Sequence, residues 1–401
     1  MADDNYELTD KNLQNLFTSI PKLLFKRSDI MSKEFTVTPW EVKGDIDYDK
    51  LIEQFGTKHI TKELLERIRK HTKDLHYMLR RKIFFSHRDF DWILDKYDSG
   101  QKFALYTGRK PSGPVHLGHL SVWMFTKWLQ DKFDVELYFE VTNDENFLFK
   151  DATLEESTKW GYDNALDVIA LGFNPKKTFI FLDTEYAKTL YGIAVKVAKH
   201  VTFSTVKGVF GFTNENNIGS IFYPAIQASP CFLPSVLKGH NVPVVIPAAI
   251  DQDNYWRMTR DLADKLGYYK PSQIHSTFLP GLLKGGKMSA SEPNSAIFTT
   301  DSPEVVEKKI MNAFTGQQPT AELQKKLGGN PDICSVCQYY FYLFEESDKK
   351  VQKIFDQERN GEILAGEHKA DLSDRTKQFI VEHQKKRERA KSQIEKFMLR
   401  D

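Results

Sequence analysis

The chain has 401 residues, and a length of roughly 100–200 residues per domain predicts two or three domains. Hydrophobic residues make up 40% of the chain and charged residues 28%, which is typical of a globular protein with enough apolar side chains for a core. Lys and Arg number 56 against 55 Asp and Glu, so a uniformly basic nucleic-acid-binding surface is excluded, although a local basic patch is not.

The N-terminal residues carry no targeting signal. Acidic residues stand where a secretory signal needs basic ones, and no apolar run of roughly 7–15 residues follows them. No stretch approaches the ~18 apolar residues of a membrane span. Three cysteines, an odd number, form no disulfide framework and suit a reducing compartment. We therefore expect a soluble, cytoplasmic protein with no membrane partner.

Residues 1–100 are expected to form an N-terminal appendage. A short apolar stripe predicts a weak helix within residues 1–30. A clearer helical pattern covers residues 61–82, with Thr61 as its N-cap and leucine and isoleucine side chains on one face.

From residue 102 onward, predicted strands and helices alternate. Short runs rich in β-branched and aromatic residues predict strands at 102–107, 135–141, 178–182 and 243–250, and helical patterns lie near 117–132, 155–171, 185–200 and 254–266. This alternation predicts an α/β domain over residues 101–302, a doubly wound parallel sheet of the Rossmann-like kind. Ligands of such sheets bind beyond the carboxyl ends of the strands, so the residues that follow 107, 141 and 249 are the first candidates for a site.

The predicted strands end before residue 303. Ser302 is a suitable N-cap and Pro303 suits the first helical position. The remaining residues predict a helical C-terminal domain over 303–401. Its basic run 385–391 has two interpretations, a solvated helix surface or a contact with RNA, and both remain open.

Two histidines flank a glycine directly after the first predicted strand. His116, Gly118 and His119 open the helix predicted near 117–132. The N-terminus of a helix attracts anions, and a glycine lets a phosphate or a flat base approach the backbone. The pair predicts a polyphosphate site in which imidazoles stabilise charge that moves during displacement at phosphorus. A zinc site is disfavoured because no further ligands stand at a suitable spacing.

A second segment, KGGKMSAS at 284–291, follows the last predicted strand. Its glycines, lysines and hydroxyls suit a lid that closes over a triphosphate. Lys287 would neutralise a departing pyrophosphate, and Ser289 and Ser291 would donate hydrogen bonds to it. A P-loop reading of residues 281–287 is disfavoured, because Met288 stands where that motif needs a Ser or Thr hydroxyl.

Together the H-x-G-H and K-M-S-A-S segments resemble the two signatures of class I aminoacyl-tRNA synthetases. The segments YTGRKPSGPVHLGHL, AIQASP, AIDQD and KMSAS resemble the eukaryotic form of tryptophanyl-tRNA synthetase, in order over about residues 35–400. The resemblance implies a class I catalytic domain, a helical anticodon-binding domain and a homodimer. It implies activation of L-tryptophan by ATP, accompanied by Mg²⁺, and transfer of the tryptophanyl group to tRNA(Trp).

The resemblance also assigns roles to individual residues. His116, His119, Lys287, Ser289 and Ser291 would serve catalysis, and the ATP-binding residues would be Arg109, Gly118 and Met288. The residues that would bind tryptophan are Tyr106, Glu140, Glu145, Gln227 and Gln252. Within that set the Tyr106 hydroxyl would reach the indole N–H, the Glu145 carboxylate the substrate ammonium, and the two glutamines the α-amino and carboxylate groups.

The chain departs from the family pattern at three places. Glu140 stands where we expect a Gln that helps to recognise the indole; a carboxylate also accepts the indole N–H, but an unpaired charge there is costly. Asn146 stands where a basic residue is expected. Residues 315–319 differ from the family in the anticodon-binding region, so no anticodon contacts are carried over.

No resident metal site is predicted. Cys334 and Cys337 form a C-x-x-C pair, which is one half of a four-ligand zinc motif, yet the sequence offers no matching second pair of ligands. The two cysteines are interpreted as packed thiols on a helix.

Three other functions remain open from the residues themselves. A tyrosyl-tRNA synthetase shares the architecture, and only the AIDQD and KMSAS segments favour tryptophan. A small-molecule nucleotidyltransferase would not need a helical C-terminal domain. A catalytically silent RNA-binding protein derived from a synthetase would not need the polyphosphate residues His116, His119 and Lys287.

Overall fold

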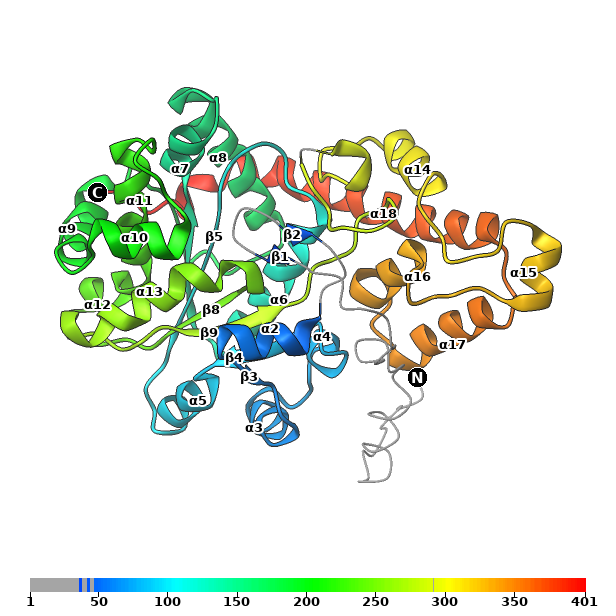
Figure 1. The fold of residues 1–401 in the computed structure, drawn as a ribbon, viewed down its shortest axis with the longest axis horizontal. Coiled ribbons are helices and arrows are strands. Elements are labelled where there is room, and N and C mark those ends of the chain that lie inside the picture. Colours follow the sequence, from blue (N-terminus) through cyan, green and yellow to red (C-terminus); the bar gives the residue numbers. More distant parts are fainter. Residues whose placement is uncertain (1–35, 38–41, 44–46, 291) are drawn as a thin grey trace.

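The structure, a computed structural model, describes residues 36–37, 42–43, 47–290 and 292–401. The helix predicted within 1–30 and the side chain of Ser291 lie outside the described residues. Within this part of the chain, a seven-stranded sheet in the order β3-β4-β9-β8-β5-β6-β7 forms the centre of the fold (Figure 1). A separate two-stranded hairpin joins β1 (Thr36–Val37) to β2 (Val42–Lys43).

Five neighbouring strands of the large sheet are parallel, which confirms the predicted doubly wound α/β architecture. They are β5 (Ala104–Arg109), β6 (Glu136–Val141), β7 (Thr178–Leu182), β8 (Val244–Ala249) and β9 (Ser272–Ser276). The first four coincide with the predicted strands, and β9 was not predicted. Residues next to each other on β5 pack into different cores, Leu105 on one face of the sheet and Tyr106 on the other. The sheet therefore needs helices on both faces.

Two further strands come from the predicted N-terminal appendage. β3 (Lys58–His59) and β4 (Phe84–Arg88) pair antiparallel, and β4 pairs antiparallel with β9. The predicted boundary at residue 100 therefore falls between two parts of one sheet. The helix predicted over 61–82 is two helices in the structure, α3 (Lys62–Thr72) and α4 (Tyr77–Arg80), because Lys73 adopts a positive φ of 68°. Thr61 caps α3 as predicted.

Helices cover the sheet on both faces. The remaining helices before residue 300 are α2 (Tyr48–Phe55), α5 (Phe90–Asp98), α6 (Leu117–Phe133), α7 (Asn143–Phe149), α8 (Leu154–Ala170), α9 (Ala187–Ala198), α10 (Phe203–Phe210), α11 (Ile218–Ala228), α12 (Leu233–Lys238) and α13 (Asp253–Ala263). Short 3₁₀ turns are η1 (Ser229–Cys231), η2 (Ile250–Gln252), η3 (Asp264–Leu266) and η4 (Pro293–Ser295). One core contains residues of α6 and α8, and the other contains residues of α9 to α13.

The C-terminal part is helical, as predicted. It contains α14 (Pro303–Met311), α15 (Ala321–Leu327), α16 (Ser335–Tyr339), the π-helical turn η5 (Tyr340–Phe344), α17 (Asp348–Arg359), α18 (Ala365–Lys391) and the 3₁₀ turn η6 (Ile394–Lys396). The long helix α18 runs from this part back across the catalytic sheet (Figure 1). Beyond it, the Ile180 N–H of β7 donates to Phe397 O, and the Leu399 N–H donates to Ile180 O, both at 2.7 Å. The end of the chain thus covers the β7 edge.

None of the described helices combines the length and apolar character that a bilayer crossing requires.

Candidate active site

Three of the predicted catalytic residues, His116, His119 and Lys287, lie near one another after the carboxyl end of β5. His116 precedes the first turn of α6, and its ring stacks on that of His119 with 3.6 Å between centroids. His116 is buried and His119 is half-buried. Burial, together with the charges of Arg109 and Lys287, lowers the pKa of His116 to about 3, and the pKa of His119 is lowered well below its usual value for the same reasons. Near neutral pH both imidazoles are therefore uncharged. His116 Nδ1 is buried and has no hydrogen-bond partner within the described chain.

Gly118 brings the two signature segments into contact. A Cβ on this residue would lie 3.0 Å from the His116 ring and 3.7 Å from the sulfur of Met288. The side chain of Met288 is buried in the core that also holds Leu117. The lid segment is therefore packed against the start of α6, and there is no room for a side chain at position 118.

Lys287 is held over the site by a carboxylate. Its ammonium lies 3.1 Å from Asp251 Oδ2 and 4.9 Å from the centroid of the Phe278 ring. Gly285 and Gly286 precede it with φ of 74° and 81°, a backbone conformation that favours glycine. The buried Asp251 was missed in the sequence, although it follows β8 in the AIDQD segment, at the strand end where ligands of such sheets bind.

The other lid residues and Gln252 lie nearby. The Ser289 backbone N–H donates to Ser295 Oγ at 3.1 Å, which closes the lid turn on itself. Gln252 follows Asp251 at the end of η2 and is half-buried. Ser291, the last predicted catalytic hydroxyl, lies outside the described residues.

Arg109 is buried inside the protein. Its Nε donates to Asn164 Oδ1 at 2.6 Å, Nη1 lies 2.5 Å from His119 Nε2, and Nη2 donates to the carbonyls of Gly113 and Pro114. Burial lowers the pKa of this guanidinium to about 10. All three of its nitrogens thus hold the His119 ring and the 109–114 loop in place. Its contact with ATP stays a prediction.

A buried hydrogen-bond network joins β5, β6 and α11. Gln227 Nε2 donates to Glu140 Oε2 at 2.8 Å and to the Tyr106 hydroxyl at 2.7 Å, and the Tyr106 hydroxyl also donates to Glu140. Glu140 is fully buried, and its Oε1 has no hydrogen-bond partner in the part of the chain that the structure describes. Three predicted tryptophan-binding residues therefore form one polar cluster.

Glu145 lies at the other side of this cluster, at the start of α7. Lys110 Nζ lies 3.3 Å from Glu145 Oε1, while the hydroxyls of Thr142 and Tyr223 donate to Oε2 at 2.8 and 3.2 Å. Tyr223 also donates to Gln227, and so joins Glu145 to the Tyr106 cluster. Lys110 and Tyr223 were missed, because neither stands at a spacing that marks it as a ligand.

Glu140 has two further carboxyl groups near it, the buried Asp183 and the half-buried Asp144. Burial raises the pKa of Glu140 and of Asp183 well above their usual values, and raises that of Asp144. Neighbouring carboxylates raise these pKa values further. Burial and the neighbouring carboxylates therefore favour the protonated form of these groups. A protonated Glu140 needs no counter-charge, so burying it costs less free energy than burying a carboxylate.

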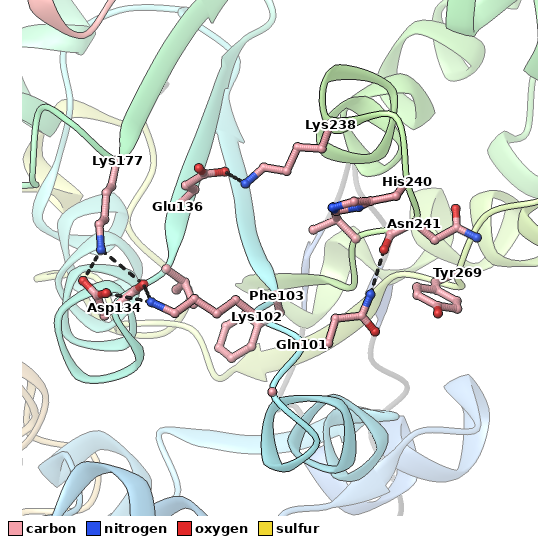
Figure 2. A pocket seen from close by; sticks show the side chains of 13 residues that line it. Gln101, Lys102, Phe103, Asp134, Glu136, Lys177, Lys238, His240, Asn241 and Tyr269 are labelled. Carbon is pink, nitrogen blue, oxygen red and sulfur yellow. Dashed lines mark hydrogen bonds and ion pairs between the residues drawn. The ribbon is translucent and has the colours of Figure 1, made fainter.

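A second hollow lies at the opposite, amino end of the parallel strands (Figure 2). Its charged groups are paired with each other. Lys102 lies 2.7 Å from Asp134 Oδ2, Lys177 also pairs with Asp134, and Lys238 lies 2.7 Å from Glu136 Oε2. None of the predicted site residues lines it, so we place the candidate site at the carboxyl end.

The basic run 385–391 does not form one exposed surface. Arg387 is buried, with Nη2 at 2.7 Å from Asp163 Oδ1 and Nε at 3.2 Å from Asp167 Oδ1 on α8. Lys385, Lys386 and Arg389 are exposed. The run therefore divides between a contact with the catalytic part and a solvent-facing basic surface.

The chain resembles known proteins over most of its length. The family described as class I tRNA synthetases (W and Y) matches residues 98–381. The tryptophan–tRNA ligase of Saccharolobus solfataricus is 52% identical over 370 residues, which cover 92% of this chain and 96% of that protein. The crystal structure of Plasmodium falciparum tryptophanyl-tRNA synthetase has a TM-score of 0.83 and 40% identity, covering 88% and 97% of the two chains.

A tryptophan-bound structure is among the similar ones. The tryptophanyl-tRNA synthetase of Encephalitozoon cuniculi has a TM-score of 0.81 and 36% identity, covering 88% of this chain and 98% of that one. The similar structures share the fold of this chain over most of its length. The chain belongs to the tryptophanyl-tRNA synthetases of class I.

Proposed function

We propose that this chain is a tryptophan–tRNA ligase that activates L-tryptophan with ATP and charges tRNA(Trp). The observation that carries the proposal is that two groups of predicted site residues are joined to one strand, β5. The stacked histidines follow its carboxyl end, and Tyr106 of the same strand forms the polar cluster with Glu140 and Gln227. Relatives about half identical to this chain are tryptophan–tRNA ligases, which supports the same substrate here.

ATP enters as its magnesium complex, with the metal held mainly by phosphate oxygens. The start of α6 offers backbone N–H groups and a favourable dipole for the phosphates. His116, with an unpaired buried ring nitrogen, and His119 contact them as neutral imidazoles. Gly118 and Met288 border the nucleotide, and Arg109 supports His119 from behind.

The first step joins tryptophan to AMP. A tryptophan carboxylate oxygen attacks the α-phosphorus, the bond from that phosphorus to the bridging oxygen breaks, and pyrophosphate leaves. Lys287 exchanges Asp251 for the pyrophosphate and stabilises its growing charge, assisted by Ser289 and Ser291. In the second step a hydroxyl of the terminal tRNA ribose attacks the activated carbonyl, and AMP leaves with the bonding electrons.

The indole is recognised by the Tyr106 cluster. Tyr106, Glu140 and Gln227 together offer hydroxyl and carboxyl oxygens and an amide, and one of the oxygens would accept the indole N–H. The substrate ammonium replaces Lys110 beside Glu145. Gln252 contributes a further amide to the carboxylate end of the substrate.

Tyrosine is the nearest alternative substrate. Its ring is smaller than indole and its donor stands at a different place, so it would leave a cavity and an unpaired buried acceptor. Where polar recognition is complete, a pocket of this kind rejects a substrate without the matching donor by roughly 10⁴–10⁵-fold.

The transfer RNA would contact the exposed basic residues of α18. Lys385, Lys386 and Arg389 face solvent on the helix that links the C-terminal helices to the catalytic sheet (Figure 1). Affinity that rests on phosphate contacts falls as salt rises. We extend the proposal to residues 303–401 as the anticodon-binding domain and 101–302 as the catalytic domain.

A homodimer would cover an apolar surface on α9, α10 and α11. Tyr191 is 61% exposed, Phe203 42% and Ile218 84%. Large apolar side chains gathered on one surface mark interaction sites. A cytoplasmic location is supported by the three cysteines, which are all free thiols.

Charging of tRNA tests the proposal. Purified protein is incubated with ATP, magnesium, tRNA(Trp) and either radiolabelled tryptophan or radiolabelled tyrosine. The expected result is acid-precipitable label from tryptophan alone, with binding that weakens at higher salt. Label from tyrosine, or no label from folded protein, would contradict it.

A further inference from the structure

A cluster of potential metal ligands lies in the C-terminal helical part. One thiol sulfur each from Cys334 and Cys337 and one carboxylate oxygen of Glu358 all lie within 4.8 Å of one another, and all three residues are buried. The sequence predicts two packed thiols, because no second pair of ligands follows at a suitable spacing. The structure supplies the missing carboxylate from the far end of α17.

The buried carboxylate of Glu358 has few partners that compensate its negative charge. Its side chain is inaccessible to solvent; Oε2 accepts from Gln317 Nε2 at 2.8 Å and lies 3.3 Å from His368 Nδ1. Its Oε1 has no hydrogen-bond partner among the residues that the structure describes, and the same holds for His368 Nε2. A buried carboxylate with an unpaired oxygen is costly unless a cation compensates it.

The surroundings fix this carboxylate in place. The Gly329 N–H donates to Glu358 O at 2.8 Å, and Gln324 Nε2 donates to the same carbonyl at 3.2 Å. A Cβ on Gly329 would lie 3.0 Å from Glu358 Oε1, so a larger residue there would crowd the carboxylate. The His368 ring stacks on Tyr340 at 5.3 Å between centroids. The acid and its histidine are therefore oriented before any ligand binds.

We propose that Cys334, Cys337 and Glu358 bind a zinc ion, with His368 as the residue that orients Glu358. Two thiolates and a carboxylate are ligands that Zn²⁺ accepts, with bonds of about 2.3 Å to sulfur and about 2.0–2.2 Å to oxygen. Two sulfurs on one tetrahedral zinc are then about 3.8 Å apart, which agrees with ligand atoms that all lie within 4.8 Å of one another. A histidine bonded to a ligating carboxylate is a usual partner in the surroundings of a metal.

The zinc would join segments that are distant in the sequence. Cys334 and Cys337 flank the start of α16, Glu358 lies near the end of α17, and His368 lies in the first turns of α18. Ser335, next to Cys334, donates its hydroxyl to Gly281 O at 3.0 Å, so the cluster lies close to the start of the lid segment. The ion would have a structural role, and its loss is read from metal content and stability, which report on the site itself.

Metal content tests the proposal directly. Protein purified without chelator, with added Zn²⁺ during expression, should contain about one zinc per chain by plasma mass spectrometry. The variants Cys334→Ser, Cys337→Ser and Glu358→Gln should each lose most of it. Cys231→Ser is the matched control, because Cys231 is a buried thiol in the other core and should keep the zinc. His368→Ala should retain zinc more weakly, with a lower occupancy after dialysis.

A titration of the native chain covers the case in which a variant fails to fold. After chelation, Co²⁺ should restore a near-ultraviolet thiolate-to-cobalt absorption that Zn²⁺ then bleaches, and Zn²⁺ should raise Tm by several degrees. Folded native protein without metal and without the cobalt absorption would overturn the proposal. A Cys334–Cys337 disulfide in protein prepared without reductant, insensitive to Zn²⁺, would overturn it as well.

Discussion

The Lys287 ammonium lies 3.1 Å from Asp251 Oδ2, so the lid segment is bonded to the residue that follows β8. The carboxylate holds the lysine near the two histidines, whose pKa values Lys287 helps to lower. A lysine that is already in position loses less freedom when the phosphates arrive. We propose that Asp251 positions Lys287 and that Lys287 contacts the phosphates during the reaction.

Lys287→Ala should slow adenylate formation by about 10²–10³-fold, because it removes a charge that stabilises the departing pyrophosphate. The Kd for tryptophan should stay unchanged, since Lys287 lies on the ATP side. Stopped-flow adenylate formation and equilibrium tryptophan binding check the two expectations. Equal losses in both would contradict a role confined to the transition state.

Asp251→Asn should reduce the same rate by a smaller factor, because the lysine remains but is no longer held. The double variant Asp251→Asn/Lys287→Ala should equal Lys287→Ala alone, since Asp251 acts through Lys287. Asp264→Asn is the control; this exposed carboxylate pairs with Lys270 at 3.0 Å on the surface and should have no effect. Additive losses from the two site changes would show that Asp251 acts independently.

Glu140→Gln should change how stability depends on pH. Burial raises the pKa of Glu140 in the folded protein above its usual value of 4.5. Its favourable contribution to the free energy of unfolding is therefore full below that pH and declines as the pH rises. A glutamine cannot lose a proton. The Tm of the variant should therefore gain on that of the native protein from about pH 4.5 upward. A Tm difference that is constant with pH would contradict a raised pKa.

The histidines should show the opposite dependence. The pKa of His116 is lowered to about 3, so its stabilising contribution is full above about pH 6.5 and is lost as the pH falls toward 3. In His116→Asn this loss is absent. The Tm advantage of the native protein over the variant should therefore shrink on acidification, as followed by thermal melts in matched buffers. An advantage that grew at low pH would mean that the imidazole is charged in the folded state.

Arg387→Ala should destabilise the catalytic part rather than weaken RNA binding alone. It leaves Asp167 buried without one of its partners, and breaking a buried ion pair costs about 3 kcal/mol or more. Denaturant melts measure the loss. Lys385→Ala/Lys386→Ala removes only exposed charges, and should keep the stability while weakening tRNA charging.

Contacts of the last residues with β7 and α9 predict the effect of removing residues 385–401. We expect both adenylate formation and charging to fail, because Phe397 and Leu399 pair with β7 and Asp401 accepts from the Lys188 and Thr189 N–H groups at the start of α9. A truncated protein that still formed adenylate would contradict this structural role.

Strands with continuous apolar runs could be predicted from the sequence, as at β6 and β7. β9 could not, because Ser272, Gln273 and His275 read as a polar loop. The structure buries these residues by pairing them: His275 Nδ1 lies 2.9 Å from Ser86 Oγ, and Ser272 Oγ donates to Arg88 O at 2.6 Å. Such compensation depends on a neighbouring strand that is distant in the sequence.

The candidate site shows the same division. His116, Gly118, His119 and Lys287 stand in segments with recognisable spacing, and the structure brings them together. Asp251 and Tyr223 lie in the site only because separate helices and strands approach each other in the fold. A single residue has no motif spacing by which the sequence could mark it. Glu358 cannot be recognised as a zinc ligand from the sequence, because it lies twenty-one residues beyond Cys337 and belongs to no ligand motif.

The most direct test is amino-acid-dependent exchange of pyrophosphate into ATP, measured with all twenty amino acids and without tRNA. We expect exchange with tryptophan alone, because the proposed role of the Tyr106, Glu140 and Gln227 cluster is to accept the indole N–H. Exchange with tyrosine in place of tryptophan, or with no amino acid although the protein is folded, would contradict it.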